Sequence, residues 1–587
     1  MAWQTSEKRA SPVPRAWVML EARLQDQHWS AKLNPLTSWR PSELPDSWAP
    51  THGWALARVL AVVVILVVAA FVALERPSVA HRLSEAGRRL GRRLLIGVLG
   101  VSAVLAVATY ADFGVFRYGT YLNEWDFYHY YVGTKYAHEL GYTNLYGATL
   151  AADLEGGLRY RNPRNEIRDL GTAELRSVYE VAAEGARYRD RFSHERWREF
   201  VADITWFKMQ LPPNRWSLVL ADHGYNGTPA WSFVVGGLVT RHLSVRNPIS
   251  RGLMLALDPL LLLAATLAVT WAFGLRTALV MVIFIGTHYL FSWGHLKGAL
   301  LRTDFAMASV LGVCLVKQRH HHIAGVLLGW AILSRVFPAF LLVGPIVLFL
   351  WRLRRDHRVD RHTLGLLLAC AATVIVVVLG SCAYFGTTEI WHEWTQKIAL
   401  HYVGGSDWDL GYRTIAETTF SHGVPQRAVA DPVAQHAVLP LGASSAMVAL
   451  LLGLPALTFI RGMEDHEALA YGFVFVFLLA LAAYYYYLVL CVPLLFFAPR
   501  LERPQYALGV AFMFFTGIAG YVLFSGWPPL ASSWAIFRGW RQTFPTYYFL
   551  SCFIAVTVGQ MILVAGSETL RAERRPAGGA LPPVKEW

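Results

Sequence analysis

The sequence predicts an all-α polytopic membrane protein, and three observations support that class. Hydrophobic residues fill 55% of the 587 positions, whereas charged residues fill only 16%. The mean hydropathy is +0.36. Long apolar runs recur between residues 54 and 566. A chain of this composition is too apolar for a soluble protein of this size, and disordered, collagen-like and disulfide-scaffold classes are excluded.

Apolar runs that could cross a bilayer define about thirteen candidate spans. They are 54–74, 94–111, 250–272, 277–293, 304–317, 323–335, 336–351, 363–385, 438–460, 468–483, 484–498, 505–525 and 546–566. The last part of this set contains one continuous run, 468–498. We divide it in two because a single helix of that length would overshoot a hydrocarbon core of about 30 Å.

The arginines between the spans predict their orientation. The connection 75–93 carries six arginines, and 352–361 carries five. Basic loops stay on the cytoplasmic side, so the polar loops 112–249 and 386–437 are expected on the outer side. The alternation closes if 230–243 lies as a helix in the outer interface instead of crossing it.

This orientation divides the chain into seven segments. They are an N-terminal polar segment (1–53), the first two membrane helices (54–111), an outer loop with interfacial helices (112–249), a transmembrane module (250–385), a second outer loop (386–437), a C-terminal transmembrane module (438–566) and a polar tail (567–587). Within the first outer loop, the charged stretch 153–208 is expected to be helical around 174–192 and to act as scaffold. Function is expected where the two outer loops meet the membrane.

The segment after the second span combines carboxylates, a histidine and aromatic rings. Residues 121–147 place Glu124, Asp126 and His129 beside Tyr130 and eight further Phe, Trp and Tyr residues. A carboxylate at a membrane boundary can have a raised pKa and can accept a proton from a hydroxyl-bearing ligand. An aromatic belt with solvated charges would have the same composition.

Basic residues near the outer ends of later spans could bind an anion. Arg302 and Asp304 stand at the mouth of one span, Arg335 lies inside an apolar run, and His295 and Lys297 add positive charge to the same rim. Ionisable groups at such depth usually pair or line a water-filled cavity, and arginine can bind phosphate with a bidentate fork. An Arg302–Asp304 bridge that only orients its helix, and interfacial positions for His295 and Lys297, are the structural alternatives.

The second outer loop offers sugar-type contacts, because aromatic faces can stack on pyranose rings. His401 with Tyr402, and Asp409 with Trp408, are the candidates, and a folded loop with aromatic anchors is the alternative. Three consecutive histidines, 320–322, are expected on the cytoplasmic side. They cannot all reach one ion from a short loop, so no metal site is predicted there.

Several short motifs resemble glycosyltransferase family 87, whose members belong to the glycosyltransferase C superfold. The motifs are Asp126-Phe127-x-x-Tyr130-Tyr131 followed by Gly141 and Leu145-Tyr146, then Thr228-Pro229-Ala230-Trp231, and then AGVLLGWAILSRVFPAFLLVGP at 324–345. The likeness covers roughly 94–351. It departs from the family at Arg335, where a lysine is usual, and at Gly294-His295-Leu296-Lys297, where the family has a Gly-Gln/Asn-x-Asn element.

The resemblance implies a transferase that moves a sugar from a polyprenyl-phosphate donor to a lipid or glycan acceptor, with inversion. Asp126 would be the general base. Arg335, with Arg302 and Lys297, would bind the phosphate, and Asp304 or Glu124 would orient Arg302 or the acceptor.

The same resemblance implies the setting of the protein. The active face would point outward from the cytoplasmic membrane, among membrane lipids. No nucleic acid, no nucleotide and no cofactor is expected, because a lipid phosphate is the leaving group. A lipid-linked-sugar flippase or other transporter, and a non-catalytic membrane scaffold, are the alternatives. A transporter would need cationic groups along a central path, whereas this sequence concentrates them at one face.

Overall fold

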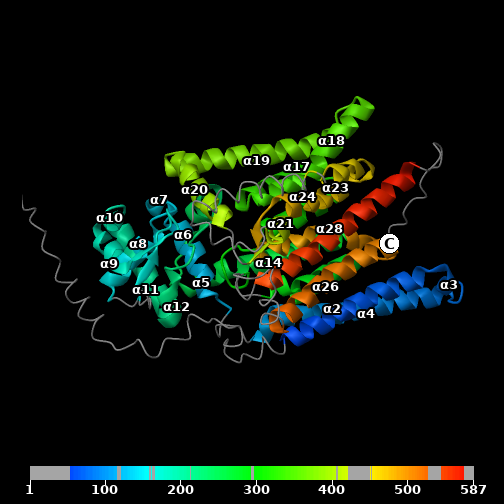
Figure 1. The fold of residues 1–587 in the computed structure, drawn as a ribbon, viewed down its shortest axis with the longest axis horizontal. Coiled ribbons are helices and arrows are strands. Elements are labelled where there is room, and N and C mark those ends of the chain that lie inside the picture. Colours follow the sequence, from blue (N-terminus) through cyan, green and yellow to red (C-terminus); the bar gives the residue numbers. More distant parts are fainter. Residues whose placement is uncertain are drawn as a thin grey trace, which may run out of the picture. The chain divides into compact units, whose positions relative to one another are not determined.

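The computed structural model describes residues 53–114, 121–157, 160, 165–211, 213–292, 296–404, 408–420, 450, 453–526 and 544–573, all within one compact unit that starts at Ser47. Regular structure in this part of the chain is almost entirely helical (Figure 1). Seven of the described helices are long and apolar enough to cross a membrane: Trp54–Glu75, Glu85–Tyr110, Pro248–Phe273, Phe337–Asp356, Arg361–Phe385, Pro504–Ser525 and Pro545–Arg571. The protein is therefore an all-α membrane protein, and the count of thirteen spans stays a prediction.

The first two long helices, α2 (Trp54–Glu75) and α4 (Glu85–Tyr110), pack against each other and are joined by the short α3 (Pro77–Ala80). Pro77 begins α3, where a missing N–H costs nothing, and the Ser84 hydroxyl caps α4 by accepting a hydrogen bond from Gly87 N. Large apolar side chains of α4 stay exposed, with Val104 at 70%. Such a face suits lipid and not water.

The first large loop folds into short helices around a small hairpin. Its elements are η3 (Asp112–Gly114), α5 (Glu124–Phe127), η4 (Tyr128–Val132), α6 (Gly133–Lys135), α7 (Ala137–Leu140), α8 (Leu145–Glu155), β1 (Glu166–Arg168), β2 (Leu175–Ser177), α9 (Val178–Ala183), α10 (Gly185–Arg189), α11 (His194–Gln210) and α12 (Pro213–Val219). The predicted helix around 174–192 is wrong at its start, because β2 pairs antiparallel with β1. Helix begins only after Ser177, whose hydroxyl accepts a hydrogen bond from Tyr179 N.

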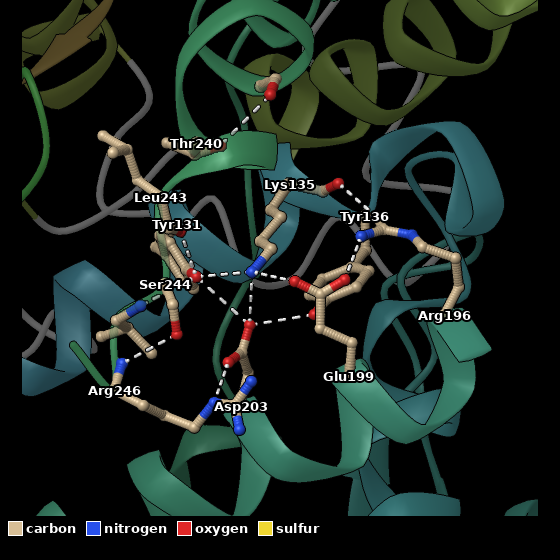
Figure 2. A network of polar contacts seen from close by, with 12 residues as sticks. Tyr131, Lys135, Tyr136, Arg196, Glu199, Asp203, Thr240, Leu243, Ser244 and Arg246 are labelled. Carbon is tan, nitrogen blue, oxygen red and sulfur yellow. Dashed lines mark hydrogen bonds and ion pairs between the residues drawn. The ribbon is translucent and has the colours of Figure 1, made fainter. Parts of the chain in front are cut away.

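A buried network of polar contacts ties α6 and η4 to α11 (Figure 2). The Lys135 ammonium lies 2.7 Å from Tyr131 Oη, 2.8 Å from Asp203 Oδ2 and 2.7 Å from Glu199 Oε1. Tyr136 Oη also donates to Asp203 Oδ2, at 2.9 Å. Because the Lys135 and Asp203 side chains are fully buried, these contacts fix the segment that follows Asp126.

The stretch predicted to lie in the interface is helical, as expected. It forms α13 (Pro229–Trp231), η5 (Ser232–Val239) and η6 (Thr240–His242). Gly236 and Gly237 allow η5 to pack closely against α6 and α19 (Arg361–Phe385), since a Cβ at Gly236 would lie 2.4 Å from Thr134 O and one at Gly237 2.9 Å from the Tyr384 ring. Its position relative to a bilayer stays a prediction.

The middle of the chain forms a packed helical group. Its elements are α14 (Pro248–Phe273), α15 (Leu275–Thr287), η7 (Tyr289–Phe291), α16 (Asp304–Lys317), α17 (His321–Ser334), η8 (Phe337–Leu342), α18 (Val343–Asp356), α19, α20 (Glu389–Gly404), β3 (Asp409–Leu410) and α21 (Tyr412–Phe420). Glycines bring α17 and α19 together, because a Cβ at Gly325 would lie 2.3 Å from Leu366 O. Small residues at a helix contact are typical of membrane proteins.

The C-terminal part contains η10 (Ile460–Gly462), α23 (Asp465–Tyr471), α24 (Phe473–Leu479), β4 (Ala482–Ala483), η11 (Tyr484–Leu490), α25 (Cys491–Phe497), η12 (Ala498–Arg500), α26 (Pro504–Gly526) and α28 (Phe544–Glu573). The helix is interrupted between Leu479 and Tyr484, inside the run that we divided on grounds of length. At this break, β4 pairs with β3.

Ion pairs cluster at one end of the helical group. Lys317, at the end of α16, pairs with Glu464, and His321, at the start of α17, lies 3.1 Å from Asp465 Oδ2. Arg352 contacts the same Asp465 at 2.6 Å. Asp304 and Ser334 therefore lie at the opposite end of α16 and α17.

Candidate functional site

Asp126 sits in a short helix whose start is capped by Asn123. The Asn123 Oδ1 atom accepts a hydrogen bond from Asp126 N at 3.2 Å, and Asn123 Nδ2 donates to Asp126 Oδ2 at 2.8 Å. Asparagine is a favoured cap because its side chain satisfies an otherwise unpaired N–H. The Asp126 side chain is 11% exposed, so its carboxylate is held in a defined, nearly buried position.

Arg302 lies against this carboxylate. Its Nη2 atom is 3.9 Å from Asp126 Oδ1, and its guanidinium carbon lies 4.1 Å from the centre of the Tyr130 ring and 5.0 Å from that of Tyr485. Guanidinium groups are attracted to aromatic faces, more so where water is excluded. The alternative Arg302–Asp304 bridge is not the arrangement observed, because Arg302 faces Asp126.

Arg335 enters the same group from the end of α17. The backbone becomes extended at this residue. The side chain is brought to Tyr130, whose Oη accepts a hydrogen bond from Nη2 at 3.2 Å, while Nη1 donates to Ser334 O at 2.7 Å. Its guanidinium carbon lies 5.4 Å from the rings of both Tyr130 and Tyr486. Arg302 and Arg335 thus contact one tyrosine ring.

The hydrogen bonding of Arg335 is incomplete among the described residues. The residue is 7% exposed, and its Nε atom has no hydrogen-bond partner there. No described carboxylate forms an ion pair with it. The charge of Asp304 acts on Arg335, but both Asp304 oxygens are hydrogen-bonded to other side chains. A buried guanidinium with an unsatisfied N–H donor costs free energy. The arrangement can therefore accept an anion.

Asp304 does not pair with either arginine directly but supports the end of α17. Its Oδ2 accepts a hydrogen bond from Trp231 Nε1 at 3.0 Å, and its Oδ1 accepts one from Ser334 Oγ at 2.8 Å. Thr228 Oγ1 donates to Leu333 O. The Thr-Pro-Ala-Trp motif and Asp304 together hold the turn that delivers Arg335.

Glu124 is a second buried carboxylate, two residues before Asp126. Burial raises its pKa from 4.5 to about 6, and the positive charge of Arg215 opposes that rise. No hydrogen bond to another described side chain is found for it. A carboxyl group of this kind can exchange a proton near neutral pH.

His129 forms its hydrogen bonds within the loop. Its Nδ1 lies 2.9 Å from Trp125 O and its Nε2 lies 2.8 Å from Tyr146 Oη. Burial lowers its pKa, against the opposing charge of Asp222. A neutral ring that donates from Nδ1 and accepts at Nε2 satisfies both contacts, so both ring nitrogens are hydrogen-bonded within the loop.

The predicted role of Lys297 as a rim cation is not matched by its surroundings. Its ammonium lies 3.1 Å from Asp112 Oδ1 and 5.0 Å from the centre of the Tyr110 ring. Lys297 is buried, which lowers its pKa, and Asp112 opposes that shift. The Asp112 carboxylate thus pairs with the Lys297 ammonium, which was expected to bind phosphate. His295 lies outside the described residues, as does the side chain of His401.

The second loop reaches the site through its short strand. Asp409 pairs with Ala483, and Trp408 O accepts a hydrogen bond from Tyr484 N at 2.9 Å. The chain then runs directly into Tyr485 and Tyr486, whose rings lie over the arginines. The sequence pattern does not mark these tyrosines, because an aromatic run in an apolar stretch has no signal that separates a site from scaffold.

Asp258 is a further residue that sequence reasoning missed. It lies inside a candidate membrane helix and accepts hydrogen bonds from the backbone N–H groups of Arg302 and Thr303, both at 2.9 Å. An acidic residue before Pro259 within an apolar run was the signal that could have found it.

No protein-family model, no curated protein and no solved structure matches the chain. The class of protein that fold and site define is an all-α membrane protein with two buried arginines beside a buried carboxylate.

Proposed function

We propose that the protein is a membrane glycosyltransferase that moves a sugar from a polyprenyl-phosphate donor to a lipid or glycan acceptor, with inversion. One observation carries the proposal, namely the meeting of Asp126, Arg302 and Arg335 around Tyr130. It brings a carboxylate and two cations within the span of a sugar phosphate. These three residues come from parts of the chain that are far apart in sequence.

The two arginines would bind the donor phosphate. Arginine presents several N–H donors in a planar fork that matches phosphate oxygens, and Arg335 keeps an Nε–H without a partner among the described residues. As the bond between the anomeric carbon and the phosphate oxygen breaks, its electron pair goes to the phosphate. Positive charge nearby stabilises that developing charge.

Asp126 would accept the proton of the acceptor hydroxyl. The acceptor oxygen would attack the anomeric carbon from the face opposite the phosphate, which inverts the configuration. Asp126 is held by Asn123 at one oxygen and lies near Arg302 with the other. Glu124, whose pKa is raised to about 6, would orient the acceptor.

The proposal includes a glycosyltransferase C-like architecture of about thirteen spans, with the site at the outer face of the cytoplasmic membrane. The placement of helix ends supports it. The arginine-rich connection 352–361 lies at the same end of the helical group as Lys317 and His321, through the contact of Arg352 with Asp465. The candidate site lies at the other end, and basic loops favour the cytoplasm.

The test is sugar transfer or release by the purified protein in detergent, with a panel of short-chain polyprenyl-phosphate sugars. We expect Asp126→Asn to lower turnover about 10²- to 10⁴-fold, which is the usual contribution of a general base, with donor binding retained. Arg335→Ala should lose turnover and weaken donor binding as well. Glu195→Gln and Arg198→Ala, which change exposed residues of α11, are matched controls and should leave both unchanged.

Three results would overturn this assignment. Asp126→Asn with most of its turnover would remove Asp126 as the base. Wild-type protein that neither binds nor turns over any donor would favour the non-catalytic scaffold. Counterflow of a lipid-linked sugar in proteoliposomes without transfer would favour the transporter.

A further inference from the structure

Residues 296–303, which lead into α16, form no regular secondary structure. Residues 296–303 are described, and most of them are buried, including Leu300, Arg302 and Thr303. Backbone N–H groups in such a place need partners, because water is not available to them. The partners of this loop therefore decide its conformation.

Asp258 supplies partners for the end of the loop. Its Oδ2 accepts a hydrogen bond from Arg302 N at 2.9 Å, and its Oδ1 accepts hydrogen bonds from Thr303 N at 2.9 Å and from Thr303 Oγ1 at 2.6 Å. All three donors belong to two consecutive residues. Asp258 is 1% exposed, and a charged acceptor makes strong hydrogen bonds where water is excluded.

The other side of the loop is held by the segment that carries Asp126. Asn123 N donates to Gly298 O at 2.9 Å, and a Cβ at Gly298 would lie 1.6 Å from Tyr121 O. Gly298 also has a φ of +68°, which glycine adopts at little cost. The loop is thus clamped between α14 and the cap of α5.

We propose that Asp258 is a positioning residue that fixes the backbone of Arg302 and so directs its guanidinium to Tyr130 and Asp126. Two consecutive N–H groups held by one carboxylate set the direction in which the Arg302 side chain leaves the chain. Leu301, immediately before it, has a φ of +49°, a conformation that a non-glycine residue keeps only when its surroundings impose it. The role in anion binding rests on the proposed function.

The variant Asp258→Asn should keep the hydrogen bonds to Thr303 and lose the one to the backbone N–H of Arg302. The remaining carbonyl oxygen can still accept from Thr303, whereas the new NH₂ group meets the N–H of Arg302, so two donors face each other. Asp153→Asn is the matched control. Asp153 is an equally buried carboxylate on α8 that pairs with Lys208 at 2.8 Å, and it is not part of the site.

The probes are a short-chain polyprenyl monophosphate and the corresponding uncharged polyprenol, each titrated against the full-length protein in detergent. We expect Asp258→Asn to weaken monophosphate binding about tenfold and to leave polyprenol binding unchanged. Asp153→Asn should lower thermal stability without changing the affinity for the monophosphate relative to that for the polyprenol. In an Arg302→Ala background, Asp258→Asn should have no further effect on monophosphate binding, because coupled residues are not additive.

Hydrogen exchange of the peptide that covers 296–305 gives a readout that needs no ligand. We expect faster exchange in Asp258→Asn and wild-type exchange in Asp153→Asn. Unchanged exchange in Asp258→Asn, or equal losses of monophosphate and polyprenol binding, would overturn the positioning role. Faster exchange together with a wild type that binds no monophosphate would support the hold of Asp258 on the loop and overturn the donor proposal instead.

Discussion

Two buried cationic groups of this protein differ in how their charge is compensated. The Lys135 ammonium is surrounded by Asp203, Glu199 and the hydroxyl of Tyr131, all within 2.8 Å (Figure 2). The Arg335 guanidinium contacts a carbonyl oxygen and a tyrosine hydroxyl but pairs with no carboxylate among the described residues. Burial alone therefore does not mark a binding site. A buried cation that is paired with carboxylates stabilises the fold, whereas a buried cation without a paired carboxylate can hold an anionic ligand.

The largest expected effect is the loss of stability when the paired cation, Lys135, is replaced. Lys135→Met should lower the free energy of unfolding by about 3–5 kcal/mol, because it removes the buried ammonium and leaves Asp203 with only the partly exposed Arg246 as a cationic partner. Thermal or denaturant unfolding in detergent would measure this loss. A loss below about 1 kcal/mol would mean that water or Arg246, which lies 3.2 Å from Asp203 Oδ1, compensates the carboxylate, and the comparison would fail on that side.

A smaller effect is expected when a lipid phosphate binds to Arg335, the cation without a paired carboxylate. Polyprenyl monophosphate at about one hundred times its dissociation constant should stabilise the wild type by about 2.7 kcal/mol. Arg335→Gln should lose most of this stabilisation while its unliganded stability stays close to wild type. Thermal shifts with and without the lipid provide the measurement. Stabilisation of the variant equal to that of the wild type would place the anion elsewhere.

The carboxylates of the site should respond to pH in a defined direction. Burial raises the pKa of Glu124 to about 6 from 4.5, so the folded state holds this proton more tightly than the unfolded state. Its contribution is favourable below pH 4.5 and is lost as the pH rises through 6. Glu124→Gln should therefore stabilise the protein by about 1 kcal/mol at pH 7.5, after allowance for screening, and by nothing at pH 4. Unfolding at the two pH values tests this, and equal effects at both would contradict it.

The smallest effect concerns the tyrosines. Tyr136→Phe removes a hydroxyl that donates to Asp203 at 2.9 Å and should cost about 1 kcal/mol of stability. Donor binding should not change, because Tyr136 does not contact either arginine of the site. Measurement of both quantities on one preparation would show whether the two groups are energetically separate. Weakened donor binding in this variant would show that they are coupled.

The sequence predicted the membrane class and several members of the site for a common reason. Asp126, Arg302 and Arg335 are ionisable residues in or beside apolar runs, where each has a large energetic cost and therefore a strong signal. Lys297 gave the same signal, but the sequence did not show its pairing with Asp112, which lies 185 positions away. A partner at that distance in the chain cannot be read from local pattern.

Other parts of the structure had signals too weak for sequence reasoning. The β1–β2 hairpin was missed because Leu175–Ser177 is short and continues into a helix of similar composition. The contact of His321 with Asp465, at 3.1 Å, joins residues 144 positions apart, which a local pattern does not show. Tyr485 and Tyr486 acquire a role only through the arginines that pack on them.

The wide helical turn η4 joins the two groups compared above. A π-helical turn contains one residue more than an α-helical turn and is often found at functional sites. Within it, Tyr130 contacts Arg302 and Arg335, while its neighbour Tyr131 contacts Lys135 and Asp203. The extra residue of the π-helical turn thus sets the directions in which these two neighbouring side chains point. A one-residue deletion in Tyr128–Val132 would rotate one of the two tyrosines out of its group, whichever way the helix re-formed.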